Sequence, residues 1–255
     1  MKRYIKASVV NISDMPLEDL MELASDHKTP PETLEKIATV LNRSNILSYI
    51  DLAKDIIANP NTPHSVLEWF ATKFYNVKQI TQRLAKNSNA SPTTLATLSK
   101  SELLTRCFVA ENPNTPIATL KQLAQPEEDA DVRYGVACNK NLSKDLVDIL
   151  VNDPNPDIRS ELADKTDLPI DLVQYILHSL VDDSDRLVRY SVALNVHCPT
   201  ELLHTLSIDA DSLVRQAVAV HQNTSNEDLI ELAKDSDIHV TGSAKQSLRI
   251  RGVRV

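Results

Sequence analysis

One short motif recurs along the chain and constrains its fold more than any other feature. Residues 59–63 and residues 112–116 both read Asn-Pro-Asn-Thr-Pro, and a Leu-rich stretch follows each copy. Degenerate copies run through most of the 255 residues. Self-similarity with a period of roughly 20–50 residues is typical of proteins in which stacked units bury their apolar faces against one another. The chain is therefore expected to be a repeat protein.

Four columns of the repeat align in eight registers, with steps of 33, 28, 25, 27, 26, 30 and 26 residues. A small or apolar column is followed after six residues by Pro or Ser, after four more by an apolar residue, and after three more by another. The first column holds Ala24, Ile57, Ala85, Ala110, Ala137, Ala163, Ala193 and Ala219; the second holds Pro30, Pro63, Ser91, Pro116, Ser143, Pro169, Pro199 and Ser225. The apolar columns hold Leu34, Leu67, Leu95, Leu120, Val147, Val173, Leu203 and Leu229, and then Ile37, Phe70, Leu98, Leu123, Leu150, Ile176, Leu206 and Leu232.

Each unit is predicted to contain two short helices. The apolar pair three residues apart forms one helical stripe, and Pro suits the first turn of that helix because its missing N–H needs no partner there. Thr29, Thr62 and Thr115, just before Pro, are predicted N-caps. The second helix carries an Arg column, as in Asp131-Val-Arg-Tyr-Gly-Val-Ala137, and ends at an Asn whose side chain can bond nearby backbone.

These columns resemble the leucine-rich repeat variant family of bacterial proteins. The matching pattern is Val-Arg-x-x-Val-Ala-x-Asn, then Asn-Thr-Pro, then Leu-Leu-x-x-Leu, across roughly residues 16–248. The resemblance implies an all-α fold: a right-handed superhelical solenoid of about eight repeats that alternate α- and 3-10-helices, akin to armadillo and HEAT repeats. The Arg column is expected to begin only at Arg133. The family's founding member carries a cysteine-ligated iron–sulfur cluster, but this chain lacks the matching cysteines, so no cofactor is expected.

The expected organisation is an N-terminal cap segment at residues 1–15, the solenoid at 16–248 and a basic tail at 249–255. The basic tail could pair as a strand, contact a partner or fray. No stretch is long enough to span a membrane, and an odd number of cysteines without metal spacing fits a reducing compartment, so a bacterial cytoplasm is expected.

Charge is distributed unevenly along the chain. The formal net charge is −8, and residues 126–185 alone carry fifteen acidic and five basic residues, a local charge of −10. A general phosphate-binding surface is therefore not indicated, and nucleic acid is an unfavoured partner.

The Arg column is the first candidate binding face: Arg133, Arg159, Arg189 and Arg215. These side chains could recognise an acidic partner or phosphate. The favoured interpretation is structural: each guanidinium forks onto an acidic or amide residue four positions earlier, in its own or the adjacent unit, at Asp129, Asn155, Asp185 or Asp211.

Two further groups are considered as sites. Trp69, beside Phe70 and Phe74, is a candidate aromatic anchor for a peptide, although packing of the early repeats is the favoured interpretation. His178, His197, His204, His221 and His239 gather in the last repeats, but their spacing matches no metal-binding pattern, so no metal site is predicted.

No catalytic constellation or nucleotide-binding motif is present in the sequence. The predicted function is a non-enzymatic scaffold that binds a protein or peptide on its concave face. The alternatives are a HEAT-like nucleic-acid-binding protein that uses the Arg column, an enzyme or regulatory module with one buried site, and a structural component of a bacterial or phage-derived assembly. The sequence leaves the partner and the oligomeric state open.

Overall fold

The structure is a computed structural model that describes residues 11–41 and 46–254. Within these residues the chain forms seventeen α-helices and two short 3-10 helices, and no strand. The all-α fold class is therefore confirmed for the described part of the chain. Residues 1–10, which make up most of the predicted N-terminal cap segment, lie outside the described residues.

The chain divides into two compact units, residues 1–123 and 124–255. The first unit contains η1 (Ile12–Asp14), α1 (Leu17–Ser25), α2 (Pro31–Leu41), η2 (Ile46–Tyr49), α3 (Ile50–Ala58), α4 (His64–Lys73), α5 (Lys78–Ala85), α6 (Pro92–Leu98), α7 (Leu103–Glu111) and α8 (Ile117–Leu123). The second contains α9 (Ala130–Cys138), α10 (Lys144–Leu150), α11 (Pro156–Ala163), α12 (Ile170–Leu180), α13 (Arg186–Leu194), α14 (Thr200–Ser207), α15 (Ser212–Val220), α16 (Asn226–Leu232) and α17 (Ile238–Ile250).

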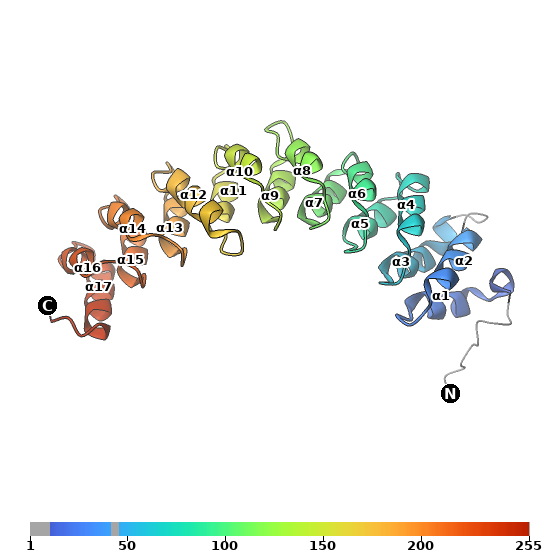
Figure 1. The fold of residues 1–255 in the computed structure, drawn as a ribbon, viewed down its shortest axis with the longest axis horizontal. Helices are drawn as coiled ribbons and strands as arrows, with labels where there is room; N and C mark the ends of the chain where they lie inside the picture. The colour runs from blue at the N-terminus through green and yellow to red at the C-terminus, as the bar shows by residue number, and fades with distance from the viewer. Residues whose placement is uncertain (1–10, 42–45, 255) are drawn as a thin grey trace. The chain divides into compact units, whose positions relative to one another are not determined.

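Each unit is built from two layers of helices. In the second unit α9, α11, α13, α15 and α17 pack against one another in that order, and α1, α3, α5 and α7 do the same in the first. We call these helices the odd layer; the even-numbered helices form the even layer and pack against their odd neighbours (Figure 1). Every helix thus contacts helices close in sequence, as expected when short amphipathic segments must bury one face each.

The core consists of the columns that the sequence aligns. All eight residues of the small column are fully buried, and the two apolar columns are buried throughout. Phe70 is the bulkiest of the fully buried side chains. Each buried Leu or Ile contributes roughly 1.5–3 kcal/mol by leaving water, so the alignment of these columns along the chain defines the interior of both layers.

The ends of the even helices differ from the prediction. Pro63, Pro169 and Pro199 are N-cap residues, one position before the first helical turn. The threonines before Pro30, Pro63 and Pro116 are not caps. Thr29 Oγ1 donates to the carbonyl of Leu23 at 2.6 Å, and Thr62 and Thr115 make the same bond to the carbonyls six residues earlier. A Thr hydroxyl can donate to a preceding helix carbonyl as well as accept from an amide, and here it ends the odd helix.

The expected alternation of α- and 3-10-helices is wrong. Both helices of each sequence repeat are α-helical, and 3-10 structure in the described residues occurs at η1 and η2. The α-helices span between 7 and 13 residues, whereas 3-10 runs longer than about four residues are uncommon because their hydrogen bonds are poorly aligned.

The C-terminal segment continues the last repeat. Leu248 is buried within α17, and Arg251 just beyond it donates to the carbonyl oxygens of Thr224 at 2.6 Å and Gln222 at 2.9 Å. The predicted tail at 249–255 therefore starts inside a helix, and its described residues form no strand. Among the helices described, none is long and apolar enough to cross a membrane.

The buried small column predicts a steric test. Ala193 is fully buried in α13, so Ala193→Leu should lower the free energy of unfolding by about 1–3 kcal/mol through overpacking. Urea unfolding followed by circular dichroism measures this change. Ala210→Leu is the control, because Ala210 is exposed in a loop and should unfold like the wild type. An unchanged midpoint for Ala193→Leu would contradict the core described here.

Candidate functional site

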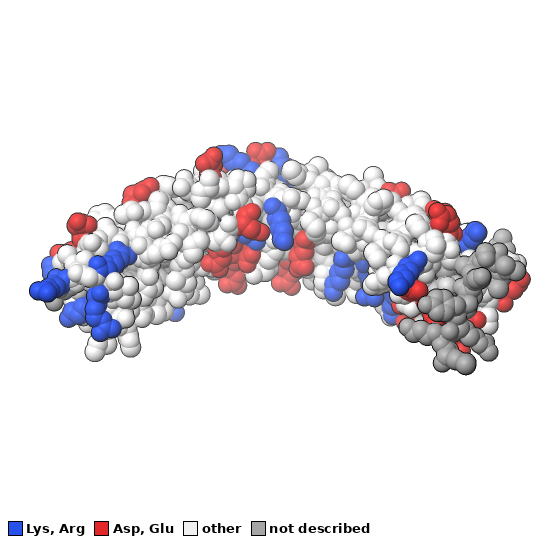
Figure 2. Space-filling model, turned by 60° about the horizontal axis from the view of Figure 1, so that its bottom comes forward, with Lys and Arg blue, Asp and Glu red and all other residues white. Residues whose placement is uncertain are grey.

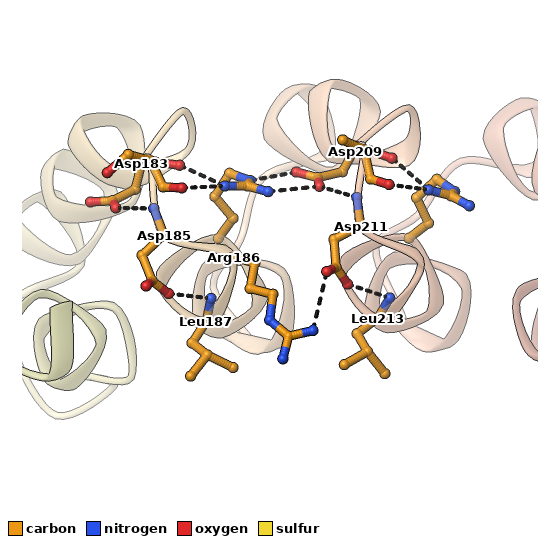
Figure 3. A network of polar contacts seen from close by, with 11 residues as sticks. Asp183, Asp185, Arg186, Leu187, Asp209, Asp211 and Leu213 are labelled. Atoms are coloured by element: carbon orange, nitrogen blue, oxygen red, sulfur yellow. Dashed lines mark hydrogen bonds and ion pairs between the residues drawn. The ribbon is translucent and has the colours of Figure 1, made fainter.

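The Arg column forms ion pairs that join successive repeats. Arg189 Nε lies 2.6 Å from Asp209 Oδ2 and its Nη2 lies 3.0 Å from Asp209 Oδ1, a bidentate fork onto the next repeat. The other forks are Arg133 to Asp153, Arg159 to Asp183 and Arg215 to Asp235, with distances between 2.6 and 3.0 Å. Figure 3 shows the fork onto Asp209, with Asp183 of the preceding repeat beside it.

The third guanidinium nitrogen makes the chain of bonds continuous. Nη1 of Arg189 donates to the backbone carbonyl of Asp183 at 2.7 Å, and Nη1 of Arg215 donates to that of Asp209 at 2.6 Å. Each of these aspartates thus accepts one Arg with its carboxylate and the next Arg with its carbonyl. We call this run, from Arg133 to Asp235, the arginine ladder.

The arginine ladder ends at Thr241, which occupies the Arg position of the last repeat. Its Oγ1 donates to the carbonyl of Asp235 at 2.8 Å, so it replaces the carbonyl bond of the missing Arg. A Thr side chain is too short to reach a carboxylate one repeat further on.

The partners of the Arg residues are not those that the sequence suggested. Asp185 is an N-cap whose Oδ1 accepts from the backbone nitrogen of Leu187 at 2.7 Å, as Figure 3 shows, and Asp129, Asn155 and Asp211 cap their helices in the same way. The ladder uses the aspartates two residues before the caps Asn155, Asp185, Asp211 and Asp237. The signal was available in the recurring Asp-x-Asp or Asp-x-Asn, six residues before the next Arg.

Arg106 is a member of the column that the sequence analysis missed. It lies four residues before Ala110, as Arg133 lies four before Ala137, and its Nη1 donates to the carbonyl of Ser101 at 2.9 Å. The statement that the column starts at Arg133 is therefore wrong. The acidic turn motif that marks the later copies is absent around Ser101.

Both partners of each ion pair in the arginine ladder are largely buried, and this strengthens the attraction between their charges. The Arg side chains are 7–16% exposed and the Asp partners 3–10% exposed. Burial opposes the ionisation of Asp183 and Asp209, but the guanidinium and backbone hydrogen bonds outweigh it and hold the pKa of both carboxyls below its usual range.

A second ladder runs along the C-terminal ends of the odd helices. The side-chain nitrogen of Asn195 donates to the carbonyls of Ala163 at 2.7 Å and Lys165 at 2.9 Å, one repeat earlier, while its Oδ1 accepts from the amide of His197. Asn59 and Asn112 make equivalent bonds. The predicted turn role is therefore only part of their function, because each Asn also ties two repeats together; we call this the asparagine ladder.

His221 takes the place of Asn in this ladder. Its Nε2 lies 2.9 Å from the carbonyl oxygen of Asn195, and its Nδ1 accepts from the backbone nitrogen of Asn223 at 3.1 Å. These bonds require a neutral ring with the proton on Nε2. Burial lowers the pKa of His221. The hydrogen bond to the Asn195 carbonyl opposes this shift, and the nearby Arg251 adds a smaller lowering.

Trp69 packs against its neighbours. Its ring lies 5.0 Å from that of Phe70 and 5.3 Å from that of Phe74, edge to face in both cases. The half-buried indole also lines a cavity of about 300 Å³ between α2 and α4. In the described residues, no group of three or more His, Cys, Asp or Glu side chains could hold a metal ion.

One surface of the second unit varies from repeat to repeat. It is the solvent-facing side of α9, α11, α13 and α15, and we call it the odd face. On α9 and α11 it carries carboxylates around a hollow of about 400 Å³: Asp131, Asp157, Glu161 and Asp164, with Tyr134. Figure 2 shows acidic side chains gathered on this part of the second unit.

On α13 and α15 the same positions are apolar. Leu187 is 50% exposed and Leu213 is 46% exposed, where α9 and α11 carry Asp131 and Asp157. Two turns further along each helix, Leu194 and Val220 are exposed where α11 carries Asp164. Figure 3 shows Leu187 and Leu213 projecting the same way from successive helices. The odd face thus changes from acidic to apolar along the layer.

No family model matches the chain, and no curated protein is significantly similar to it.

The arginine ladder predicts a large and pH-dependent effect of one amide substitution. Asp209→Asn keeps the shape but removes the charge that two Arg side chains surround, and should lower the free energy of unfolding by roughly 2–4 kcal/mol at neutral pH. Because the folded pKa is lowered, the ladder's contribution is present above the ordinary carboxyl pKa of about 3.9 and is lost as the pH falls through the folded pKa. Urea unfolding should therefore show the variant and the wild type converging in acid.

The control is Arg186→Ala. Arg186 lies 3.3 Å from Asp211 but is 57% exposed, so its loss should change stability by less than about 1 kcal/mol. Equal effects of the two substitutions would contradict the ladder as a stabilising structure.

His221 predicts a different pH dependence. Its folded pKa is lowered, so the stability that the neutral ring contributes is present above about pH 6.5, the usual pKa, and is lost as the pH falls through the folded pKa. His221→Asn restores the column residue and should remove that loss. Melting temperatures measured near pH 8 and pH 5 should fall more for the wild type than for the variant, and parallel curves would refute this role.

Proposed function

We propose that this chain is a right-handed solenoid of about eight repeats, similar to the leucine-rich repeat variant proteins, and that it acts as a non-enzymatic scaffold for a protein or peptide. The repeated core columns and the two ladders support the solenoid. The resemblance in the repeat pattern supports the family. The odd number of cysteines, which lack metal-binding spacing, supports a reducing compartment such as a bacterial cytoplasm.

One observation carries the binding function. The polar residues that recur in the two ladders join successive repeats, whereas the exposed residues of the odd face differ from one repeat to the next. Each Arg of the arginine ladder donates hydrogen bonds from all three guanidinium nitrogens to protein oxygens, as Arg189 does. The odd face combines a hollow with exposed Leu and Val side chains, a combination that marks protein interaction sites. The expected concave binding face is accordingly proposed to be this layer.

The same observation ranks the alternatives. Phosphate recognition by the Arg column would have to break buried forks, and the acidic half of the odd face repels a polyanion, so the nucleic-acid function is the weaker proposal. A structural role in a larger assembly would use the same apolar surface and differs only in how permanent the contact is.

The test is capture of partners from a bacterial lysate by the purified chain, with nuclease present. A protein should remain bound at moderate salt, and Leu187→Ser/Leu213→Ser should release it, because these side chains form the centre of the exposed apolar area.

The matched control is Ile170→Ser/Ile208→Ser, which removes two exposed apolar side chains of the even layer. Retention of the partner by the face variant, or capture that disappears with nuclease, would overturn the proposal.

A further inference from the structure

The exposed side chains of the odd face change from acidic to apolar along the odd layer, and this order restricts which partners can cover the face. Asp131 and Asp157 lie in the first turns of α9 and α11, whereas Leu187 and Leu213 hold the same positions on α13 and α15. This position is acidic on α9 and α11 and apolar on α13 and α15, so its chemistry changes once along the layer, between α11 and α13. A partner that lies across the helices therefore meets two chemically distinct halves.

The acidic half carries more charge than its own residues neutralise. The ion pair in the hollow joins Glu161 to Lys165 at 2.9 Å, and the Tyr134 hydroxyl donates to the other oxygen of Glu161 at 2.9 Å. Asp131 and Asp157 remain exposed at the rim. A lysine or arginine side chain complements this charge, and its aliphatic stem can lie against the Tyr134 ring.

The apolar half presents one pair of exposed apolar side chains on each of two neighbouring helices. Leu187 and Leu194 lie two helical turns apart on α13, and Leu213 and Val220 hold the matching positions on α15. All four are between 44 and 57% exposed, an unusual density of exposed aliphatic side chains on neighbouring helices.

The spacing of the helices sets the spacing of the partner's side chains. Packed helices lie roughly 8–10 Å apart. An extended polyproline-type segment rises about 3.1 Å per residue and returns to the same face every third residue, which is a step of about 9 Å. A segment crossing the layer in this conformation places residues i, i+3 and i+6 on three successive helices.

We propose that the odd face of the second unit binds an extended linear segment of another protein, in which one basic residue lies over the hollow between α9 and α11 and apolar residues three and six positions away lie on α13 and α15. This inference rests on the proposed scaffold function and specifies its partner. The basic residue fixes the register of the segment, and the apolar residues contribute most of the buried area. A strongly acidic segment or a nucleic acid is rejected by the carboxylates.

The test is selection of random linear peptides by the folded full-length chain, followed by affinity measurement with a fluorescent peptide of the selected sequence. The selected peptides should share a Lys or Arg with apolar residues three and six positions away. Asp131→Asn/Asp157→Asn and Leu187→Ser/Leu213→Ser should each weaken binding by about tenfold or more, and added salt should weaken it further.

The control for charge is Asp171→Asn/Glu227→Gln, which removes two first-turn acids from even helices and should leave affinity unchanged. Circular dichroism of every variant separates loss of binding from loss of fold.

Three outcomes overturn the inference: selected peptides without a basic residue, binding that ignores the face variants, or no selected peptide at all. If lysate capture still depends on Leu187 and Leu213 in any of these cases, the scaffold function stands and the partner is a folded surface. A dimer that the Leu variants dissociate would also overturn it, because a second copy of this chain would then cover the face.

Discussion

The bidentate pairing of an arginine with an aspartate one repeat away is the interaction on which the geometry of the second unit depends. A repeat protein has few contacts between distant residues, so its shape is the sum of its interfaces between neighbours. Packed apolar columns hold two helices together, but they permit small rotations and slides. A planar fork onto a carboxylate does not, because both N–H groups must meet both oxygens.

The two ladders restrict rotation and sliding between neighbouring odd helices, one at each end of these helices. The arginine ladder lies beside the N-terminal turns, where each Asp-x-Asp turn meets an Arg of the preceding repeat, and the asparagine ladder lies at the C-terminal caps. A helix held at both ends has a fixed crossing angle to its neighbour. Since burying an ion pair costs much of what the attraction returns, the arginine ladder contributes directional specificity more than net stability.

The sequence predicted the core well and the connections poorly. Apolar periodicity depends on local spacing, so the buried columns could be read directly, from Ala24 to Leu232. The choice between Asp183 and Asp185 as an ion-pair partner depends on how two repeats are placed in space, which spacing along one chain does not determine. Thr62 was assigned to the wrong helix end for the same reason, because its hydroxyl can serve either neighbour. The odd face could have been found from the sequence: it consists of exposed helical positions where the aligned columns disagree, such as Asp157 and Leu187.

The way the arginine ladder ends has a consequence for how such a chain can change its length. Every internal rung presents the same carboxylate to the repeat before it and the same guanidinium to the repeat after it, so a whole unit can be duplicated or deleted in register and the broken bonds close again. Thr241 lacks a side chain that can reach onward, and it marks the C-terminal end of the arginine ladder. Unequal recombination between neighbouring copies would thus add or remove modules without exposing an unpaired charge, while each new module remains free to diversify its exposed side chains.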